Sequence, residues 1–383
     1  MRSLITREVN PKEDTGSNGG GMSMVRVLFL VAPFKRHMIA RMVEEFSSDF
    51  VCGYYPPADQ DYRMDGKWAR FRATESFKKA LASFEPDVVY SDSTLDSAHY
   101  HLAYLRKCRK PPLVQHLRGD LWREFWDWYS LAGWKDRAAG VQTFAYNWGG
   151  LLFASKLAPI CVWLDRVASH YLPGRRSEVV YQGVDPAIFF YDTQLGFRRP
   201  AVGIIQNHAI LSKVRGLIEF KDVIERLPDV NFYIAEGERS GQSYLGSVKT
   251  ALAPLANVHF VKGIDRVEMV RRMLSSVDCY VLASGLDCCP TTVLEASLMQ
   301  LPVIASRVGG VPEIIMEGQT GWSIANSATK EWAEKIRLVV NDTSLGRALG
   351  REGRCWVTEK FGWPRIAEQV QRLLLKEVGL PAS

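Results

Sequence analysis

The sequence lacks several features that would assign it to a secreted, zinc-binding or membrane-spanning class. Its seven cysteines are odd in number and form no Cys-x-x-Cys pair, so neither a disulfide framework nor a zinc ribbon is indicated. No stretch supplies the ~20 consecutive apolar residues that span a bilayer, because the most apolar one, 148–164, contains Gly149, Lys156 and Pro159. We predict a buried helix followed by a strand there instead.

A secretory signal is also missing from residues 1–23, which carry Gly, Ser and mixed charge but no apolar segment. We expect this stretch to be a disordered leader, or an extension before an alternative start at Met22 or Met24. Together with the cysteine pattern, this predicts a protein of the reducing cytoplasm.

Nucleic-acid recognition motifs are absent as well, so we expect no nucleic-acid partner. The net charge of +6 indicates only a bias toward anionic partners, such as nucleotide diphosphates or phospholipid headgroups. The composition, 47% hydrophobic and 23% charged, is that of a globular protein. Its 383 residues suit two cores better than one, at roughly 100–200 residues per domain.

Short β-branched runs alternate with longer helical stretches along the chain. In the first half they begin at Val25, Phe50, Asp87, Leu113, Pro159 and Glu178. After the polar stretch 191–200 the alternation restarts, with runs that begin at Ala201, Val230, Asn257, Asp278 and Pro302. Strands alternating with helices predict parallel sheets that are covered by helices on both faces.

This division predicts an α/β protein of two Rossmann-like, doubly wound domains that face each other across a cleft. We place the first domain at residues 24–190, the linker at 191–200 and the second domain at 201–360, with a C-terminal helix in 361–383. Open α/β sheets bind ligands at the carboxyl ends of their strands, so the active site is expected between the domains. The sequence does not indicate which domain the final helix contacts.

Residues 284–322 carry the most informative motif, in which we expect a strand end, a loop, a helix, a second strand and a glycine turn. Pro290 is expected at the first helical position. The backbone amides left unpaired after it would be those of Thr291, Thr292 and Val293. Free amides and the positive end of the helix dipole favour an anion such as a diphosphate, and Glu295, one turn further on, can accept hydrogen bonds from ribose hydroxyls. The spacing also fits a structural turn that caps a helix, with a surface glutamate.

The same segment resembles the GT4 family of retaining glycosyltransferases, which have the GT-B fold. The family signature is an acidic residue, seven residues and a Glu, then a Leu-Pro-Val strand and Gly-Gly-x-Pro-Glu; here these are Asp287, Glu295, 301–303 and 309–313. The resemblance implies that Glu295 binds the nucleotide ribose. It also implies that Asp287 and the amides after Pro290 face the diphosphate and the donor sugar. Asp287 departs from the family pattern, which usually has Glu at that position.

Other residues gain a role from the resemblance. Lys213 and Arg215 are two apart in an expected extended loop, where they would share one face and bind the diphosphate; a solvated surface pair is the alternative. Gly237 and Gly263 fall where family loops surround the base, although ordinary turns explain such glycines too. His116 is expected in the loop after a strand of the first domain, where it would contact the donor sugar or serve as a structural histidine.

The implied activity is transfer of a sugar, with retention and without a metal, from a UDP- or GDP-linked donor to an acceptor hydroxyl. The acceptor would be a glycan, a lipid-linked glycan or a small molecule, and no cofactor besides the donor is implied. The Asp-x-Asp pattern at 59–61, which imitates a metal-binding motif, lies in a Pro-rich loop. Two alternatives stay open: a nucleotide-sugar epimerase of the same fold, and a non-catalytic sugar-nucleotide or carbohydrate-binding protein.

Five tryptophans lie in residues 121–148. Large aromatic side chains fill the core of many domains, so core packing is one interpretation. The other is that they stack on acceptor sugars or rest on a membrane surface. Peripheral contact with an anionic membrane at the cytoplasmic face is therefore a second hypothesis for the first domain.

Overall fold

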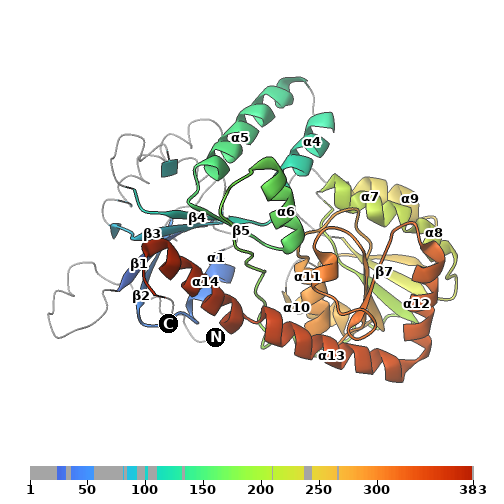
Figure 1. Cartoon of the computed structure of the whole chain (residues 1–383). Coiled ribbons are helices and arrows are strands. Elements are labelled where there is room, and N and C mark those ends of the chain that lie inside the picture. The colour runs from blue at the N-terminus through green and yellow to red at the C-terminus, as the bar shows by residue number, and fades with distance from the viewer. Residues whose placement is uncertain are drawn as a thin grey trace.

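The computed structural model consists of two α/β units, each built on a parallel sheet (Figure 1). It describes residues 24–31, 36–55, 81, 84–92, 100–101, 110–131, 134–208, 210–236, 244–264 and 267–381. The expected leader at 1–23 and the Asp-x-Asp pattern at 59–61 lie outside these residues.

The first sheet has five parallel strands in the order β2-β1-β3-β4-β5. Their bounds are Val25–Leu30 for β1, Phe50–Tyr55 for β2, Val88–Ser91 for β3, Leu113–Leu117 for β4 and Lys156–Pro159 for β5. The chain moves outward from β1 to β2 and then returns to the other side of β1. The switch point therefore lies between β1 and β3, where an open sheet leaves a crevice at its carboxyl edge.

Alternate residues of these strands face two different cores. The helices of the first unit are α1 (Arg36–Val43), α4 (Leu121–Leu131), α5 (Trp134–Leu152) and α6 (Val162–Tyr171). Val27, Phe29 and Tyr90 pack toward α1, whereas Leu28 and Leu30 pack toward α4 to α6. Figure 1 shows that α4 and α5 project away from the sheet as a pair.

The second sheet has six parallel strands in the order β11-β10-β9-β6-β7-β8, which is a doubly wound order. Their bounds are Ala201–Ile204 for β6, Asn231–Ala235 for β7, Val258–Val261 for β8, Cys279–Leu282 for β9, Val303–Ser306 for β10 and Gly321–Ile324 for β11. The switch point lies between β6 and β9, so the loops after these two strands meet at one place on the carboxyl edge.

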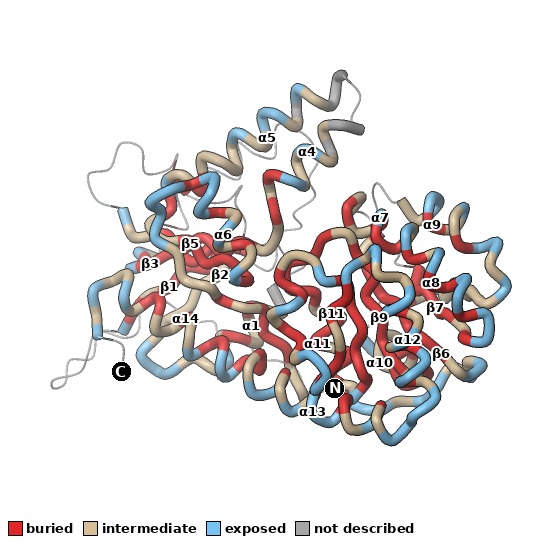
Figure 2. Tube along the Cα trace, turned by 45° about the vertical axis from the view of Figure 1, so that its right-hand side comes forward, coloured by how far each residue is buried: buried red, intermediate tan, exposed pale blue. Residues whose placement is uncertain are grey.

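Helices cover both faces of the second sheet. They are α7 (Leu211–Glu219), α8 (Lys221–Glu225), α9 (Leu245–Leu252), α10 (Val267–Leu274), α11 (Thr291–Leu298), α12 (Thr329–Asn341) and α13 (Thr343–Phe361). The core under α7, α8, α9 and α12 is separate from the core under α10, α11 and α13. The latter continues without a break into the first unit beneath α6, so the two units share apolar packing. Figure 2 shows the buried residues concentrated in the strands.

The last helix, α14 (Trp363–Val378), leaves the second unit and packs on the first. Its buried residues include Ile366 and Val370, which join the core of β1 and β3 on the side of α1. The crossing occurs at Gly362, where the amide of Val184 donates to the carbonyl of Phe361 at 2.9 Å. This contact answers the question that the sequence left open, because burial of an amphipathic face fixes the final helix to the first sheet.

Two of the strands predicted from the sequence are not formed as predicted. The run at 159–163 is divided, since β5 ends at Pro159 and α6 begins at Val162. The run at 178–182 forms no regular strand, although the amides of Glu178 and Val180 donate to β5 carbonyls. The helix and strand predicted within 148–164 are confirmed by α5 and β5.

Candidate active site

The switch point of the second sheet holds a lysine–aspartate pair. Lys213 comes from the first turn of α7, after β6, and Asp287 from the loop after β9. The Nζ atom of Lys213 donates to Oδ2 of Asp287 at 2.6 Å, with side-chain exposures of 20% and 8%. Two charges that lie this far from water interact more strongly than a surface pair. They are the charged groups best placed to meet a ligand at this edge.

Two glycines bring α7 against the loop after β9. A Cβ atom on Gly216 would lie 2.2 Å from the carbonyl carbon of Ser284, and one on Gly285 would lie 2.3 Å from the carbonyl oxygen of Ser212. Both contacts are with backbone, which cannot swing aside. The absence of side chains at these positions therefore sets the distance between Lys213 and Asp287.

The helix α11 begins directly after this loop. Pro290 is its N-cap, one residue earlier than the first helical position expected from the sequence. The amide of Val293 donates to the Pro290 carbonyl at 3.1 Å, so the expectation that this amide is unpaired is wrong. The amides of Thr291 and Thr292 remain in the first turn, where a helix offers them no partner of its own. An anion site at this helix start has two amides rather than three.

The hydroxyl of Tyr280 joins the three elements of the site. It lies 2.7 Å from the carbonyl oxygen of Ile205, after β6, and 2.7 Å from Oγ1 of Thr292. The carbonyl can only accept, so the tyrosine donates to it and the threonine hydroxyl donates to the tyrosine oxygen. This buried bridge from β9 fixes the start of α11 relative to the loop after β6. The sequence analysis did not identify Tyr280, because nothing in the sequence distinguishes it from the other residues of the predicted strand.

Glu295 lies one turn into α11 and is half-buried. Burial raises the pKa of its carboxyl to about 7 from an ordinary value of 4.5. Hydroxyl groups that donate to the carboxylate would favour its charged form and offset this cost. The Glu295 carboxylate is therefore suited to accept hydrogen bonds from the hydroxyl groups of a bound ligand.

The expectation that Lys213 and Arg215 share one face of an extended loop is wrong. Both residues lie in α7, where two residues correspond to a turn of about 200°. Arg215 is exposed, whereas Lys213 faces Asp287. The helix thus separates the two cations, and only Lys213 joins the pair at the switch point.

His116 is also placed differently from the expectation, since it lies in β4 and not in the loop after it. Its side chain is buried, and its Nε2 atom lies 3.1 Å from the carbonyl oxygen of Val180, so that nitrogen carries the proton. Its Nδ1 atom lies 3.4 Å from Oδ1 of Asp92. Burial, opposed by the nearby negative charge of Asp92, lowers the pKa of His116. These contacts support the structural alternative for this histidine.

The sequence analysis missed Asp92, which lies at the carboxyl edge of the first sheet. Asp92 follows β3 at that sheet's switch point, and its carboxylate accepts from Arg118. Arg118 also donates to the side chain of Gln182. Asp92 could have been identified from the sequence, because it is an Asp close after a short run of β-branched residues. This network fixes the Arg118 guanidinium at the carboxyl edge of the first sheet.

Glu313 was noted only as part of the Gly-Gly-x-Pro-Glu motif, but it connects the two units. Its carboxylate accepts from the amides of Val162 and Trp163, at the start of α6, each at 2.8 Å. It also accepts from the hydroxyl of Tyr181 at 2.9 Å. A carboxylate at a helix start is stabilised by the free amides and the dipole. The motif thus caps a helix of the opposite unit.

Of the two loop glycines, Gly263 follows β8 with a φ of 72° and has open space around its Cβ position. Gly237 lies outside the described residues. Neither position tests the expected contact with a nucleotide base.

Among the tryptophans, Trp122 is buried and stacks on Tyr171 with ring centroids 4.6 Å apart. Trp148 is partly buried in the same core, whereas Trp126 on α4 is 61% exposed. Core packing thus accounts for Trp122 and Trp148, but not for Trp126. Within the part of the chain that the structure describes, no helix is long and apolar enough to cross a membrane.

Comparison with known proteins adds an independent finding. Residues 207–356 match the family model for glycosyl transferases group 1. Alpha-maltose-1-phosphate synthase of Mycolicibacterium smegmatis is 26% identical over 223 residues, which cover 52% of this chain and 57% of that protein. Spore coat protein SA of Bacillus subtilis is 30% identical over 243 residues, which cover 56% of this chain and 63% of that protein. The match thus spans less than two thirds of either relative.

The whole fold is similar to solved structures. Anabaena HepE in complex with UDP-glucose superposes with a TM-score of 0.71 at 16% identity, over 92% of this chain and 100% of that chain. At this identity the likeness shows the fold, and it confirms the two-domain GT-B architecture predicted from the sequence.

Proposed function

We propose that this chain, whose residues 207–356 match the family model for glycosyl transferases group 1, transfers a sugar from a nucleotide-diphosphate sugar to an acceptor hydroxyl. The observation that carries the proposal is the Lys213–Asp287 pair at the switch point, directly before the free amides of α11. Anion-binding groups of this kind suit a diphosphate, and an acidic group beside them suits the hydroxyls of a sugar.

The donor would enter between the pair and the start of α11. Its diphosphate competes with Asp287 for the Lys213 ammonium group and accepts from the amides of Thr291 and Thr292. Asp287, released from the lysine, accepts hydrogen bonds from the sugar. Glu295 accepts from the ribose hydroxyls. The exchange of one ion pair for another keeps every charged group partnered.

In the reaction the bond between the anomeric carbon and the β-phosphate oxygen breaks, and the acceptor oxygen bonds to the same carbon. The proton of the acceptor passes to the departing phosphate oxygen. Negative charge builds on that phosphate, where Lys213 and the α11 amides stabilise it, and groups fixed before the reaction stabilise such charge without reorganising. We propose that the acceptor approaches from the side the phosphate leaves, so the configuration is retained, and that no metal takes part.

UDP is the first donor nucleotide to test, because HepE has been solved with UDP-glucose. GDP is the second. The first domain would bind the acceptor, which we propose is a glycan, a lipid-linked glycan or a small molecule. Arg118, held between Asp92 and Gln182 at the carboxyl edge of the first sheet, is placed to contact anionic or hydroxyl groups there.

The test measures the release of nucleoside diphosphate from UDP- and GDP-sugars with a panel of acceptors, in the presence of EDTA. We expect turnover by the wild type and a loss of about 100-fold or more in kcat for Lys213→Ala, as when a group that stabilises transition-state charge is removed. Lys221→Ala is the control, since Lys221 is a lysine on the next helix that pairs with Glu225.

The same assay separates the two alternatives. An epimerase would convert the sugar nucleotide without an acceptor and release no acceptor product. A binding protein would bind a nucleotide sugar and turn over none. Either result would contradict the proposed transfer.

A further inference from the structure

A cavity of about 680 Å³ lies at the opposite edge of the second sheet from the Lys213–Asp287 pair. Its lining includes Asp278 and Pro302, which directly precede β9 and β10, and Arg199, which lies two residues before β6. The sheet therefore separates it from the donor site, which lies at the carboxyl ends of the same strands. Its volume is within the usual range of small-molecule sites.

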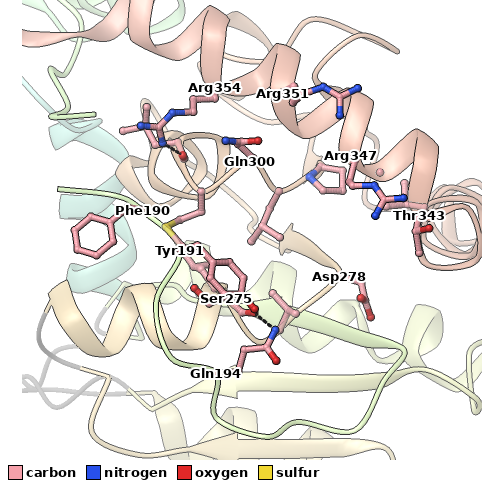
Figure 3. A pocket seen from close by; sticks show the side chains of 18 of the residues that line it. Phe190, Tyr191, Gln194, Ser275, Asp278, Gln300, Thr343, Arg347, Arg351 and Arg354 are labelled. Carbon is pink, nitrogen blue, oxygen red and sulfur yellow. Dashed lines mark hydrogen bonds between the residues drawn. The ribbon is translucent and has the colours of Figure 1, made fainter. Parts of the chain in front are cut away.

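One wall of this cavity is α13 and another is the segment that joins the two units. Arg347 and Arg351 lie one turn apart on α13, across the cavity from Tyr191 and Gln194 (Figure 3). Residues four apart on a helix share a face, with Cβ atoms about 6 Å apart. The two guanidinium groups are thus close enough to contact a single anion.

The remaining charged groups of the lining are already bonded. Asp278, the only carboxylate among the lining residues, pairs with Arg199 and accepts from the amide of Ala201 at 2.8 Å. Arg354 donates to the carbonyls of Phe189 and Pro186 at 2.9 and 3.1 Å. The Arg354 bonds hold residues 186–189 against α13, and the Asp278 bonds hold the start of β6 beside β9, so both side chains serve the fold.

Arg347 and Arg351 differ from these bonded side chains. Both are exposed, and neither makes an ion pair or hydrogen bond with any residue that the structure describes. Like charges one turn apart on a helix repel each other, and a bound anion would remove that cost. The first amides of α13 do not compete for the anion, since Asp342 accepts from the amides of Ser344 and Leu345, each at 3.0 Å.

The rest of the lining suits a hydroxylated ring. Tyr191 is 70% exposed, and its ring offers an apolar face at the cavity. The neighbouring Phe190 is already covered by Arg271, whose guanidinium carbon lies 4.2 Å from the ring centroid. Gln300, from the turn after α11, adds an amide between Arg351 and Tyr191 in the view of Figure 3. Aromatic faces with a few amides are a common setting for sugar rings and polyols.

We propose that this cavity is a second ligand site for a small phosphorylated sugar or polyol. Arg347 and Arg351 hold the phosphoryl group through charge-assisted hydrogen bonds, for which the arginine fork is well suited. Tyr191 and the amide side chains contact the hydroxylated part. The site is independent of the donor site and does not rest on the proposed sugar transfer.

Calorimetric titration of the full chain with glucose 6-phosphate, inorganic phosphate and glucose tests the proposal. We expect glucose 6-phosphate to bind more tightly than phosphate, and glucose alone not to bind measurably. Arg347→Gln with Arg351→Gln should weaken glucose 6-phosphate binding by about tenfold or more, the effect of losing charge-assisted hydrogen bonds. Tyr191→Ala should weaken glucose 6-phosphate binding but leave phosphate binding unchanged.

The matched control is Arg226→Gln with Arg337→Gln, which removes the same charge from exposed positions elsewhere in the second unit. Equal binding by the control and the wild type, with loss in the Arg347/Arg351 variant, would support the site. No binding of either phosphate-bearing probe to the wild type would overturn the proposal. So would glucose 6-phosphate binding that the Arg347/Arg351 variant retains in full, because the ligand would then lie elsewhere.

Discussion

Replacement of Glu295 by Gln tests the environment of the donor site most sharply. Burial raises the pKa of this carboxyl from 4.5 to about 7, so the folded protein holds a proton that the unfolded chain releases. Stability is therefore greatest below the unfolded pKa and falls as the pH rises from about 4.5 to about 7. Over that pH range the ionised carboxyl lowers the free energy of unfolding of the ligand-free protein. The uncharged amide introduced by Glu295→Gln does not have this effect.

The magnitude follows from the shift. One pKa unit corresponds to about 1.4 kcal/mol, so the cost of Glu295 grows by about 2.5 kcal/mol between about pH 5 and about pH 8. At roughly 2–4 °C per kcal/mol, Glu295→Gln should raise the melting temperature by about 5–10 °C more at the higher pH than at the lower one.

The assay is thermal unfolding of wild type, Glu295→Gln and the control Glu219→Gln at both pH values, without and with UDP. Glu219 is an exposed residue of α7 in the same unit, so its substitution changes the charge equally. UDP should stabilise the wild type far more than Glu295→Gln, and its affinity for the wild type should fall by up to about tenfold per pH unit below about pH 7. Equal melting shifts at the two pH values would refute the reasoning.

Three further predictions concern the framework of the site. Gly216→Ala should destabilise the fold by about 1–3 kcal/mol or more, measured by urea unfolding, because the new methyl meets the Ser284 backbone; no loss would contradict the close approach. Glu313→Gln should cost about 1–2 kcal/mol in the same assay, since α6 loses the charge that caps it; an unchanged midpoint would show that the cap contributes little. If the exposed Trp126 rests on a membrane, Trp126→Ala should lower flotation of the protein with anionic vesicles relative to wild type, and equal flotation would count against that contact.

The sequence predicted the two parallel sheets well, because these follow from the alternation of short β-branched runs with helical stretches. The position of Glu295 on the first turns of α11 also followed, since Pro290 marks a helix start. Local chemistry of this kind is encoded within a few residues. It does not depend on how distant segments pack.

The errors arose where packing decides the outcome. The stretch around Lys213 contains no proline or strong cap, so the sequence did not show that α7 starts before it and turns Arg215 away. His116 was placed in a loop because the end of β4 has no sequence marker, and only the structure shows its bond to Val180. Asp92 and Glu313 act across long sequence separations, in contacts that no single motif contains.

The most direct test of the central claim is calorimetric titration of the protein with UDP and GDP in the presence of EDTA, on wild type, Lys213→Ala and Lys221→Ala. The account predicts that one diphosphate binds the wild type and the Lys221 variant alike, and binds Lys213→Ala at least about tenfold more weakly. Binding of neither diphosphate, or full binding by Lys213→Ala, would contradict the assignment of the switch-point pair as the donor site.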